Sequence, residues 1–254
     1  MLRLVWINEL TLEDVVNYLT TNDIAIIPIG STEQHGPCGP LVVDAYSAIT
    51  IVEDAAKKTD VLATPPMWFE NSPHHLDFPG TIYLMPENLI SLVKNIVRSL
   101  ERNGFRKFIV VNGHKGTSLA ALTIACRSLK QYEIPHIKVA LTDPLFLATA
   151  LEIKDTNEHH TGELEISHVL YKHPHLIKTD KLQIENIDLK EVFSDYVKPD
   201  LFGKNKMTVE VFWNSQEQKK FAPTGSFTAS DTASPEKGKL YHDNMVNTLV
   251  EFIS

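Results

Sequence analysis

The sequence of 254 residues has few cysteines, a deficit of basic residues and no long apolar run. Its two cysteines, Cys38 and Cys126, are too few for a disulfide framework and favour a reducing compartment such as the cytoplasm. Lys and Arg number 24 against 32 Asp and Glu, which argues against a nucleic-acid-binding surface. No apolar run approaches the roughly 20 residues of a membrane span. These absences predict a soluble, cytoplasmic globular protein with neither nucleic acid nor a membrane as partner.

What the sequence contains instead is an alternation of short apolar runs and amphipathic segments. Apolar runs typical of strands buried on both faces lie at 24–29, 61–66, 107–112 and 136–142. Segments with helical periodicity lie at 45–57, 87–103, 118–131, 161–171 and 238–253. This alternation predicts right-handed βαβ units around a mainly parallel sheet. Residues 1–254 are therefore expected to form a single α/β domain.

Polar residues gather after the carboxyl ends of the predicted strands. The segment 31–36 (STEQHG) follows the first strand, 71–75 (NSPHH) the second, and 113–116 (GHKG) the third, while Asp143 follows the fourth. Ligands of open α/β sheets bind outside the carboxyl ends of the strands, so these residues are expected to meet. The opposite ends carry ordinary polar residues. The sequence thus predicts a functional site at one edge of the sheet.

Several of these residues are suited to bind metal ions. Glu33 and His35 are two positions apart, so in an extended loop they project to the same side. His114 lies in a glycine-containing loop, where the backbone can approach a ligand closely. Surface or structural roles remain alternatives for these three. Asp44 stands where the next helix should begin and has an N-cap role as its alternative.

A further cluster of acids and histidines lies at 158–165 (EHHTGELE). Its acids also suit a helix start, where the helix dipole favours negative charge. The predicted ligands of one or two divalent ions are Glu33, His35, Asp44, His114 and Glu163. Mixed oxygen and nitrogen ligation suits Zn, Mn or Fe. If two ions are bound, Asp44 is the candidate bridge. Paired metals would polarise a carbonyl, and a nearby His or Glu would carry the proton to the leaving nitrogen.

These motifs resemble those of a known family. The segment 27–37 (IPIGSTEQHGP), followed by Asp44, resembles the opening motif of the creatininase (creatinine amidohydrolase) family. Further matches follow in family order at 78–82 (FPGTI), 112–114 (NGH), 160–167 (HTGELEIS) and 233–238 (ASPEKG). Together the motifs span roughly residues 24 to 254.

The resemblance implies a Rossmann-like three-layer α/β sandwich with two divalent metal ions per subunit. It also implies homo-oligomers, commonly hexamers. The implied reaction is hydrolysis of a non-peptide C–N bond, in a small cyclic amide or a formamide, through a hydroxide that bridges the metals. By motif, Glu33, Asp44 and His114 would hold one ion, and His35 and Asp44 the other.

The resemblance also assigns catalytic and substrate-binding roles. His160 matches a proton-transfer histidine, and Glu163 and Glu165 join it as expected catalytic residues. The expected substrate-binding residues are His75, Pro79, Gly80, Thr81 and Lys115. Creatininase itself has a glutamate ligand where this chain has Gly116, which argues against creatinine as substrate. We expect Glu163 to supply the missing carboxylate, with Glu165 as the second candidate.

Two other functions remain compatible with the residues. One is a metallohydrolase acting on another bond, such as a lactone or a peptide end. The other is a metal-binding scaffold without turnover, in which no general acid or base would be needed.

Overall fold

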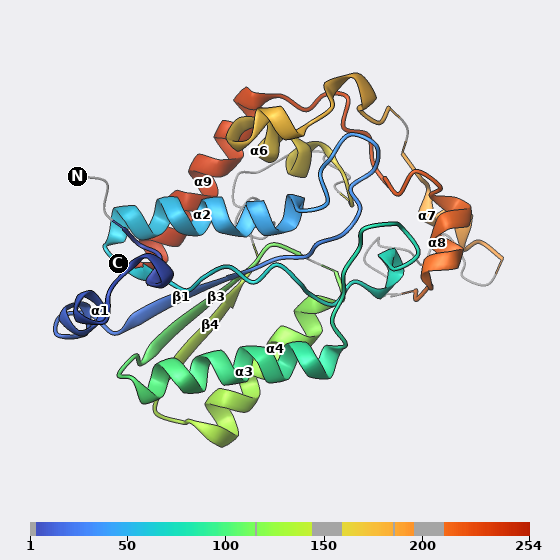
Figure 1. Cartoon of the computed structure of the whole chain (residues 1–254). Helices are drawn as coiled ribbons and strands as arrows, with labels where there is room; N and C mark the ends of the chain where they lie inside the picture. Colours follow the sequence, from blue (N-terminus) through green and yellow to red (C-terminus); the bar gives the residue numbers. More distant parts are fainter. Residues whose placement is uncertain (1–3, 115, 144–158, 185, 196–210) are drawn as a thin grey trace.

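The computed structural model describes residues 4–114, 116–143, 159–184, 186–195 and 211–254. Within these residues a four-stranded parallel sheet with strand order β2-β1-β3-β4 forms the centre of the molecule (Figure 1). The strands are β1 (Ile24–Ile29), β2 (Leu62–Ala63), β3 (Lys107–Asn112) and β4 (Lys138–Thr142). The predicted second strand is shortened to two residues, since the prolines that follow it cannot donate to a ladder.

Helices cover both faces of the sheet (Figure 1). On one face lie α2 (Val43–Thr59), α6 (Glu163–Lys172) and α9 (Pro235–Ile253). On the other lie α3 (Pro86–Arg102) and α4 (Ser118–Ser128). This arrangement confirms the predicted α/β three-layer sandwich with a parallel sheet.

Each central strand is buried on both faces, which explains its unbroken apolar sequence. In β1, Ile26 packs into the core formed with α2 and α9. Its neighbours Ala25 and Ile27 point the other way, into the core with α3 and α4. Alternate side chains of a strand face opposite sides, so one apolar run serves two cores.

The helix ends follow local sequence signals. A capping box between Thr11 and Asp14 begins α1 (Leu12–Leu19). The predicted helix 161–171 begins later, at Glu163, because Thr161 has a φ of 65° that a helix does not allow.

Short helical elements complete the described chain. They are η1 (Ile7–Glu9), η2 (Pro73–His75), η3 (Leu129–Glu133), η4 (Pro174–Leu176), η5 (Thr179–Lys181), α7 (Leu189–Val192) and α8 (Ser215–Phe221). Among the described residues, no helix has the length and apolar character that would let it cross a bilayer. That residues 1–254 form one domain stays a prediction.

Two glycines bring the strand ends against the first turn of α2. A Cβ at Gly113, just after β3, would lie 2.0 Å from the carbonyl oxygen of Asp44. A Cβ at Gly30, just after β1, would lie 2.4 Å from the Cα of Ala45. No residue with a side chain fits so close to a backbone, so glycine is required at both positions. The contact places Asp44 beside the loops that follow β1 and β3.

Candidate metal centre

Four predicted ligands from three separate segments meet in the interior. The Nε2 atom of His35 lies 3.2 Å from Oδ1 of Asp44. The Nδ1 atom of His114 lies 3.2 Å from Oδ2 of Asp44 and 3.3 Å from Oε1 of Glu33. All four side chains are buried. The two oxygens of Asp44 therefore face different histidines, as the proposed bridging role requires.

The donor atoms of this cluster are better arranged to bind a cation than to form hydrogen bonds with one another. Among the described residues, Oε1 of Glu33 and Nε2 of His35 are buried without a hydrogen-bond partner. Buried polar atoms are normally satisfied, so such a group of orphans needs an explanation. Donor atoms of Glu33, His35 and Asp44 all lie within 4.8 Å of one another. Converging oxygen and nitrogen atoms of this kind suit Zn, Mn or Fe.

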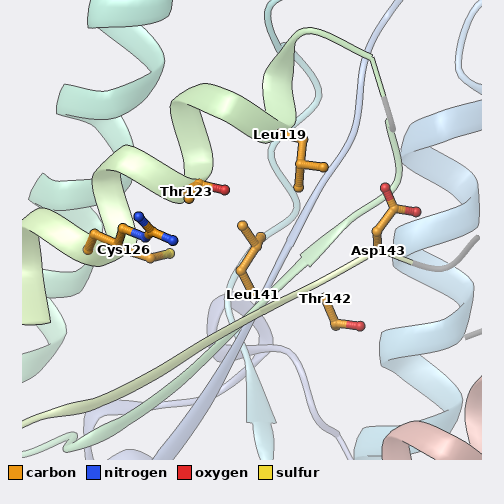
Figure 2. Close-up of a pocket in the computed structure, with 7 residues that line it drawn as sticks. Leu119, Thr123, Cys126, Leu141, Thr142 and Asp143 are labelled. Carbon is orange, nitrogen blue, oxygen red and sulfur yellow. The ribbon is translucent and has the colours of Figure 1, made fainter. Parts of the chain in front are cut away.

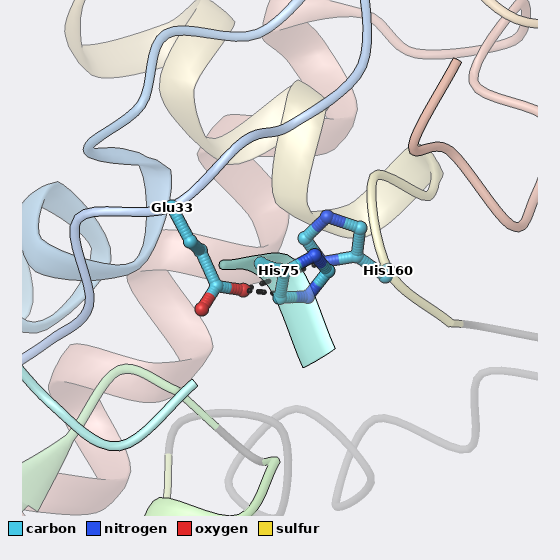
Figure 3. A group of neighbouring side chains, drawn as sticks. All are labelled: Glu33, His75 and His160. Atoms are coloured by element: carbon cyan, nitrogen blue, oxygen red, sulfur yellow. Dashed lines mark ion pairs between the residues drawn. The ribbon is translucent and has the colours of Figure 1, made fainter. Parts of the chain in front are cut away.

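Two histidines from other segments, His75 and His160, also lie beside the carboxylate of Glu33 (Figure 3). Its Oε1 lies 3.3 Å from Nε2 of His75 and 3.6 Å from Nδ1 of His160. The other oxygen, Oε2, accepts a hydrogen bond of 2.7 Å from the hydroxyl of Ser31. Although burial opposes ionisation, the charge of His114 holds the pKa of Glu33 well below its usual range. Glu33 is thus an ionised carboxylate at neutral pH.

The prediction of Glu163 as a metal ligand and catalytic residue needs correction. Its carboxylate accepts hydrogen bonds from the hydroxyl of Tyr241 at 2.7 Å, Nζ of Lys237 at 2.8 Å and the hydroxyl of Thr232 at 2.9 Å. These partners hold Glu163 against α9, so the structure does not bring it to the cluster. The same hydrogen bonds, with Lys237 the strongest cause, lower its pKa against the effect of burial.

Glu165 is the carboxylate that α6 directs at the cluster. Its Oε2 lies 3.8 Å from Nε2 of His35 and accepts a 2.7 Å hydrogen bond from the backbone N–H of Thr161. Residues two apart on a helix point roughly 200° apart, so only one of the two acids can face the metal centre. Burial, with the nearby Asp44 charge, raises the pKa of Glu165 to about 7, although His35 opposes the shift.

The two basic imidazoles of the cluster have raised pKa values. Burial alone would lower the pKa of His35, but the Asp44 carboxylate raises it to about 9. Burial likewise opposes protonation of His114, and Glu33 and Asp44 raise its pKa well above the ordinary value. Both shifts reflect the negative charge of the carboxylates. A cation in this place would be stabilised by the same charge.

His160 is held as a neutral imidazole. Its ring lies between those of His35 and His75, with centroid separations of 4.4 and 4.3 Å. Burial and these neighbouring histidines hold the pKa of His160 well below its ordinary value. Its Nε2 lies 2.7 Å from the backbone carbonyl and 2.9 Å from the side-chain amide nitrogen of Gln34, and in the Nε2–H tautomer the carbonyl accepts the ring proton. The lone pair of Nδ1 then faces Glu33 and is available to take up a proton.

His75, a predicted substrate-binding residue, is oriented by two glutamines. Its Nδ1 lies 2.8 Å from Nε2 of Gln34 and 2.9 Å from Nε2 of Gln218. The Oε1 atom of Gln34 accepts from the backbone N–H of Gly36, so its amide nitrogen is the end that faces His75. Burial lowers the pKa of His75 to about 4. The neutral ring therefore carries its proton on Nε2, toward Glu33.

The predicted loop 79–81 meets the site only indirectly. Phe78, which precedes it, is buried with its ring centroid 6.3 Å from that of His75. Pro79 and Gly80 are exposed, while the hydroxyl of Thr81 is buried without a hydrogen-bond partner among the described residues. Their role in substrate binding stays a prediction. Lys115 lies outside the described residues.

Sequence reasoning missed three polar side chains around the centre. Gln34 stands between two predicted ligands in the opening motif, and this position was the available signal. Gln218 reaches His75 from α8, and no sequence pattern connects the two.

Glu70 is the third missed residue. It is fully buried, and neither of its carboxylate oxygens has a hydrogen-bond partner among the described residues. Burial, together with the charges of Asp44 and Glu33, raises its pKa well above the ordinary value despite the opposing His114. Burial thus favours the neutral, protonated form of Glu70 more than in a free glutamate.

Comparison with known proteins identifies the family. The model of the creatininase family, described as creatinine amidohydrolase, matches residues 8–253. The chain belongs to the creatininase family. Family members among its relatives are hydrolases with different substrates.

Three characterised members of the creatininase family are similar to this chain. A 3-dehydro-scyllo-inosose hydrolase of Thermotoga maritima is 31% identical over 54% of this chain and 44% of its own length. A creatinine amidohydrolase of Pseudomonas putida is 26% identical over 72% of this chain and 77% of its own. A mycofactocin precursor peptide peptidase of Mycolicibacterium smegmatis is 32% identical over 64% of this chain and 63% of its own. The first and third matches thus span less than two thirds of the relative.

Solved structures of creatininases share the fold. One named "Creatininase Mn" has a TM-score of 0.80 and 22% identity, and the match covers 99% of this chain and 98% of that one. A Zn-Zn form of a creatininase variant has a TM-score of 0.77 with the same identity, over 99% and 97% of the two chains. The names of these two proteins include a metal, Mn in one and Zn in the other.

Proposed function

We propose that this creatininase-family protein is a metal-dependent amidohydrolase that cleaves a non-peptide C–N bond in a small cyclic amide or a formamide. The observation that carries the proposal is the position of Asp44 between His35 and His114, with one oxygen near each ring. A homo-oligomeric, cytoplasmic protein, with the hexamer as the expected assembly, is part of the same proposal.

The donor set divides into two groups around Asp44. Glu33, Asp44 and His114 would hold one divalent ion, and His35, Asp44 and Glu165 the other. Glu165 thus replaces the Glu163 of the sequence-based prediction. Divalent ions bound there would polarise the amide carbonyl and lower the pKa of water at neutral pH.

The chain's own residues supply the proton transfer. His160 is neutral, and its Nδ1 faces Glu33 at 3.6 Å, so this atom can take up a proton and return it to the leaving nitrogen. Its other nitrogen is fixed by the Gln34 carbonyl, which holds the ring in one orientation. His75 presents an N–H at the same centre and would donate a hydrogen bond to a substrate oxygen.

A peptide end is the alternative substrate that a specific observation favours. The mycofactocin precursor peptide peptidase is similar to this chain at 32% identity. A lactone is a further alternative bond, and a metal-binding scaffold without turnover is the non-enzyme alternative. The ordered partners of His75 and His160 favour catalysis, because a scaffold needs no oriented imidazole at the metal.

Metal analysis combined with a substrate screen tests the proposal. We expect about two Zn, Mn or Fe ions per chain in the purified protein, and hydrolysis within a panel of lactams, formamides, ureido compounds, lactones and peptides. Asp44→Ala should lose most of the metal and lower kcat/KM by about 1000-fold or more. Glu163→Gln is the matched control, which should keep its metal. An Asp44→Ala protein with full metal content and turnover would disprove the assignment.

A further inference from the structure

A cavity of about 950 Å³ adjoins the metal centre. Its described walls come from the η2 turn, from the beginning of α4 and from the segment around Trp213. α8 contacts the η2 turn, and Figure 1 shows α7 and α8 together at this end of the molecule. The described lining includes no Lys, Arg, Asp or Glu. A cavity of this size matches sites that bury a drug-sized molecule, and it is larger than a small cyclic amide needs.

A neighbouring cavity differs in its chemistry. It measures about 510 Å³ and lies between α4 and β4, with Leu119 and Thr123 lining both (Figure 2). Arg127 and the buried Asp143 line this smaller cavity. The larger cavity is the one whose described walls are free of charged side chains.

The inner end of the larger cavity lies directly against a metal ligand. Gly116 lines the cavity, and a Cβ at this position would lie 2.5 Å from Nε2 of His114. The wall here is therefore bare backbone with the imidazole immediately behind it. His74, which also lines the cavity, lies 4.1 Å from His75 and 6.4 Å from His114 between ring centroids.

An aromatic group forms another part of the cavity wall. Phe193 stacks on Trp213 at 5.6 Å, and His74 meets the indole edge-on at 6.2 Å. The indole N–H donates a 3.0 Å hydrogen bond to Gln218, whose amide nitrogen in turn contacts His75. One glutamine thus fixes both the cavity wall and a histidine of the metal centre.

We propose that this cavity binds a bulky apolar group, in particular an aromatic ring, on the amide substrate. The inference rests on the proposed amidohydrolase function and specifies its substrate class. Aromatic and aliphatic walls favour an apolar guest because both surfaces leave water.

Two formamides that differ only in their substituent test the inference. N-benzylformamide carries an aromatic ring and N-methylformamide does not. We expect the wild-type enzyme to hydrolyse the benzyl compound with a kcat/KM at least about tenfold higher. Ala120→Trp fills the cavity from an exposed position of α4, and the ratio of the two kcat/KM values should then fall about tenfold. Ser91→Trp, an exposed position of α3 outside the cavity lining, is the matched control and should keep the wild-type ratio.

A binding measurement separates this inference from the proposed function. Calorimetric titration of the metal-loaded protein with N-benzylformamide does not depend on turnover. If Ala120→Trp weakens the binding of N-benzylformamide about tenfold, the result supports the cavity assignment even if neither amide is hydrolysed. In that case the amidohydrolase proposal fails instead. Equal kcat/KM for both amides, or binding that Ala120→Trp leaves unchanged, overturns the inference and leaves the proposed function standing. Absence of benzyl-compound binding overturns it as well.

Discussion

Oδ2 of Asp44 lies 3.2 Å from Nδ1 of His114, although the two residues are 70 positions apart in the chain. The contact joins the first turn of α2 to the loop after β3. It places a carboxylate at the point where the two halves of the donor cluster meet.

The two acids of α6 should respond differently to loss of charge. Glu165→Gln should remove a ligand and lower the metal content toward one ion per chain, since only Glu165 lies near His35. Glu163→Gln should keep the metal but lose charge-assisted hydrogen bonds to Lys237 and Tyr241, at a cost of about 1–3 kcal/mol in unfolding free energy. Elemental analysis and urea unfolding of both variants measure the difference. Metal loss in Glu163→Gln with none in Glu165→Gln would reverse our assignment.

Metal binding should release protons. Without an ion, the pKa of His35 is raised to about 9, so this ring is charged at pH 7.5, and the pKa of His114 is shifted in the same direction by the nearby carboxylates. A metal needs their lone pairs, so about two protons should leave per loaded chain. Calorimetry in buffers of different ionisation enthalpy counts them. Apparent affinity should rise with pH up to about 9, and a heat of binding independent of buffer would contradict the cluster electrostatics.

The raised pKa of His35 also affects the stability of the metal-free protein. This stability should fall as the pH rises, whereas the metal affinity rises. The raised pKa of His35 means that its ion pair with Asp44 stabilises the fold fully below the ordinary histidine pKa. This stabilisation is lost as the pH rises through about 9. Urea unfolding of the chelator-treated protein should therefore show a stability decline between pH 7 and 10 that saturating metal suppresses.

A buried histidine pair should make the protein sensitive to acid. Nε2 of His168 lies 2.9 Å from Nδ1 of His242, whose Nε2 contacts Asp54 at 2.8 Å. Burial holds the pKa of His168 well below its ordinary value, so the unfolded chain binds a proton that the folded chain does not. Stability should fall by about 1.4 kcal/mol per pH unit as the pH drops below roughly 6.5. His168→Gln should flatten this slope in urea unfolding between pH 5 and 7.5, and an unchanged slope would point to other groups.

Glu70→Gln should be tolerated or stabilising. Burial raises the pKa of Glu70 well above its ordinary value, so the folded protein holds it protonated while the unfolded chain ionises it. The carboxyl therefore destabilises the fold increasingly as the pH rises above about 4.3. An amide of the same shape removes this penalty. We expect the stability of the variant relative to wild type to grow by up to about 1.4 kcal/mol per pH unit above about pH 4.3 in urea unfolding, and a loss of stability would indicate an essential charge.

Much of the fold was predictable because strand burial and helix periodicity leave clear patterns. The runs at 24–29 and 107–112 are the observed β1 and β3, and their unbroken apolar character follows from helices on both faces. The convergence of Glu33, His35, Asp44 and His114 was equally predictable, since each follows or faces the carboxyl end of a strand.

The assignment within 160–167 was wrong for a geometric reason. Glu163 and Glu165 are two apart, and which of them faces the centre depends on where α6 begins. Thr161, with its left-handed backbone, delays the helix and sets that phase. Gln218 was beyond prediction because its contact with His75 comes from tertiary packing of α8, with no periodic signal.

At Gly30 and Gly113 the main chain after β1 and β3 packs directly against the main chain of the first turn of α2. Such a contact has no rotamer that can change to absorb a displacement of the helix. A core substitution that moves α2 along its axis, such as enlargement of the buried Ala55 about three turns from Asp44, would carry the carboxylate with it. Loss of metal affinity would then precede loss of folding, so ion content reports on the integrity of the distant core.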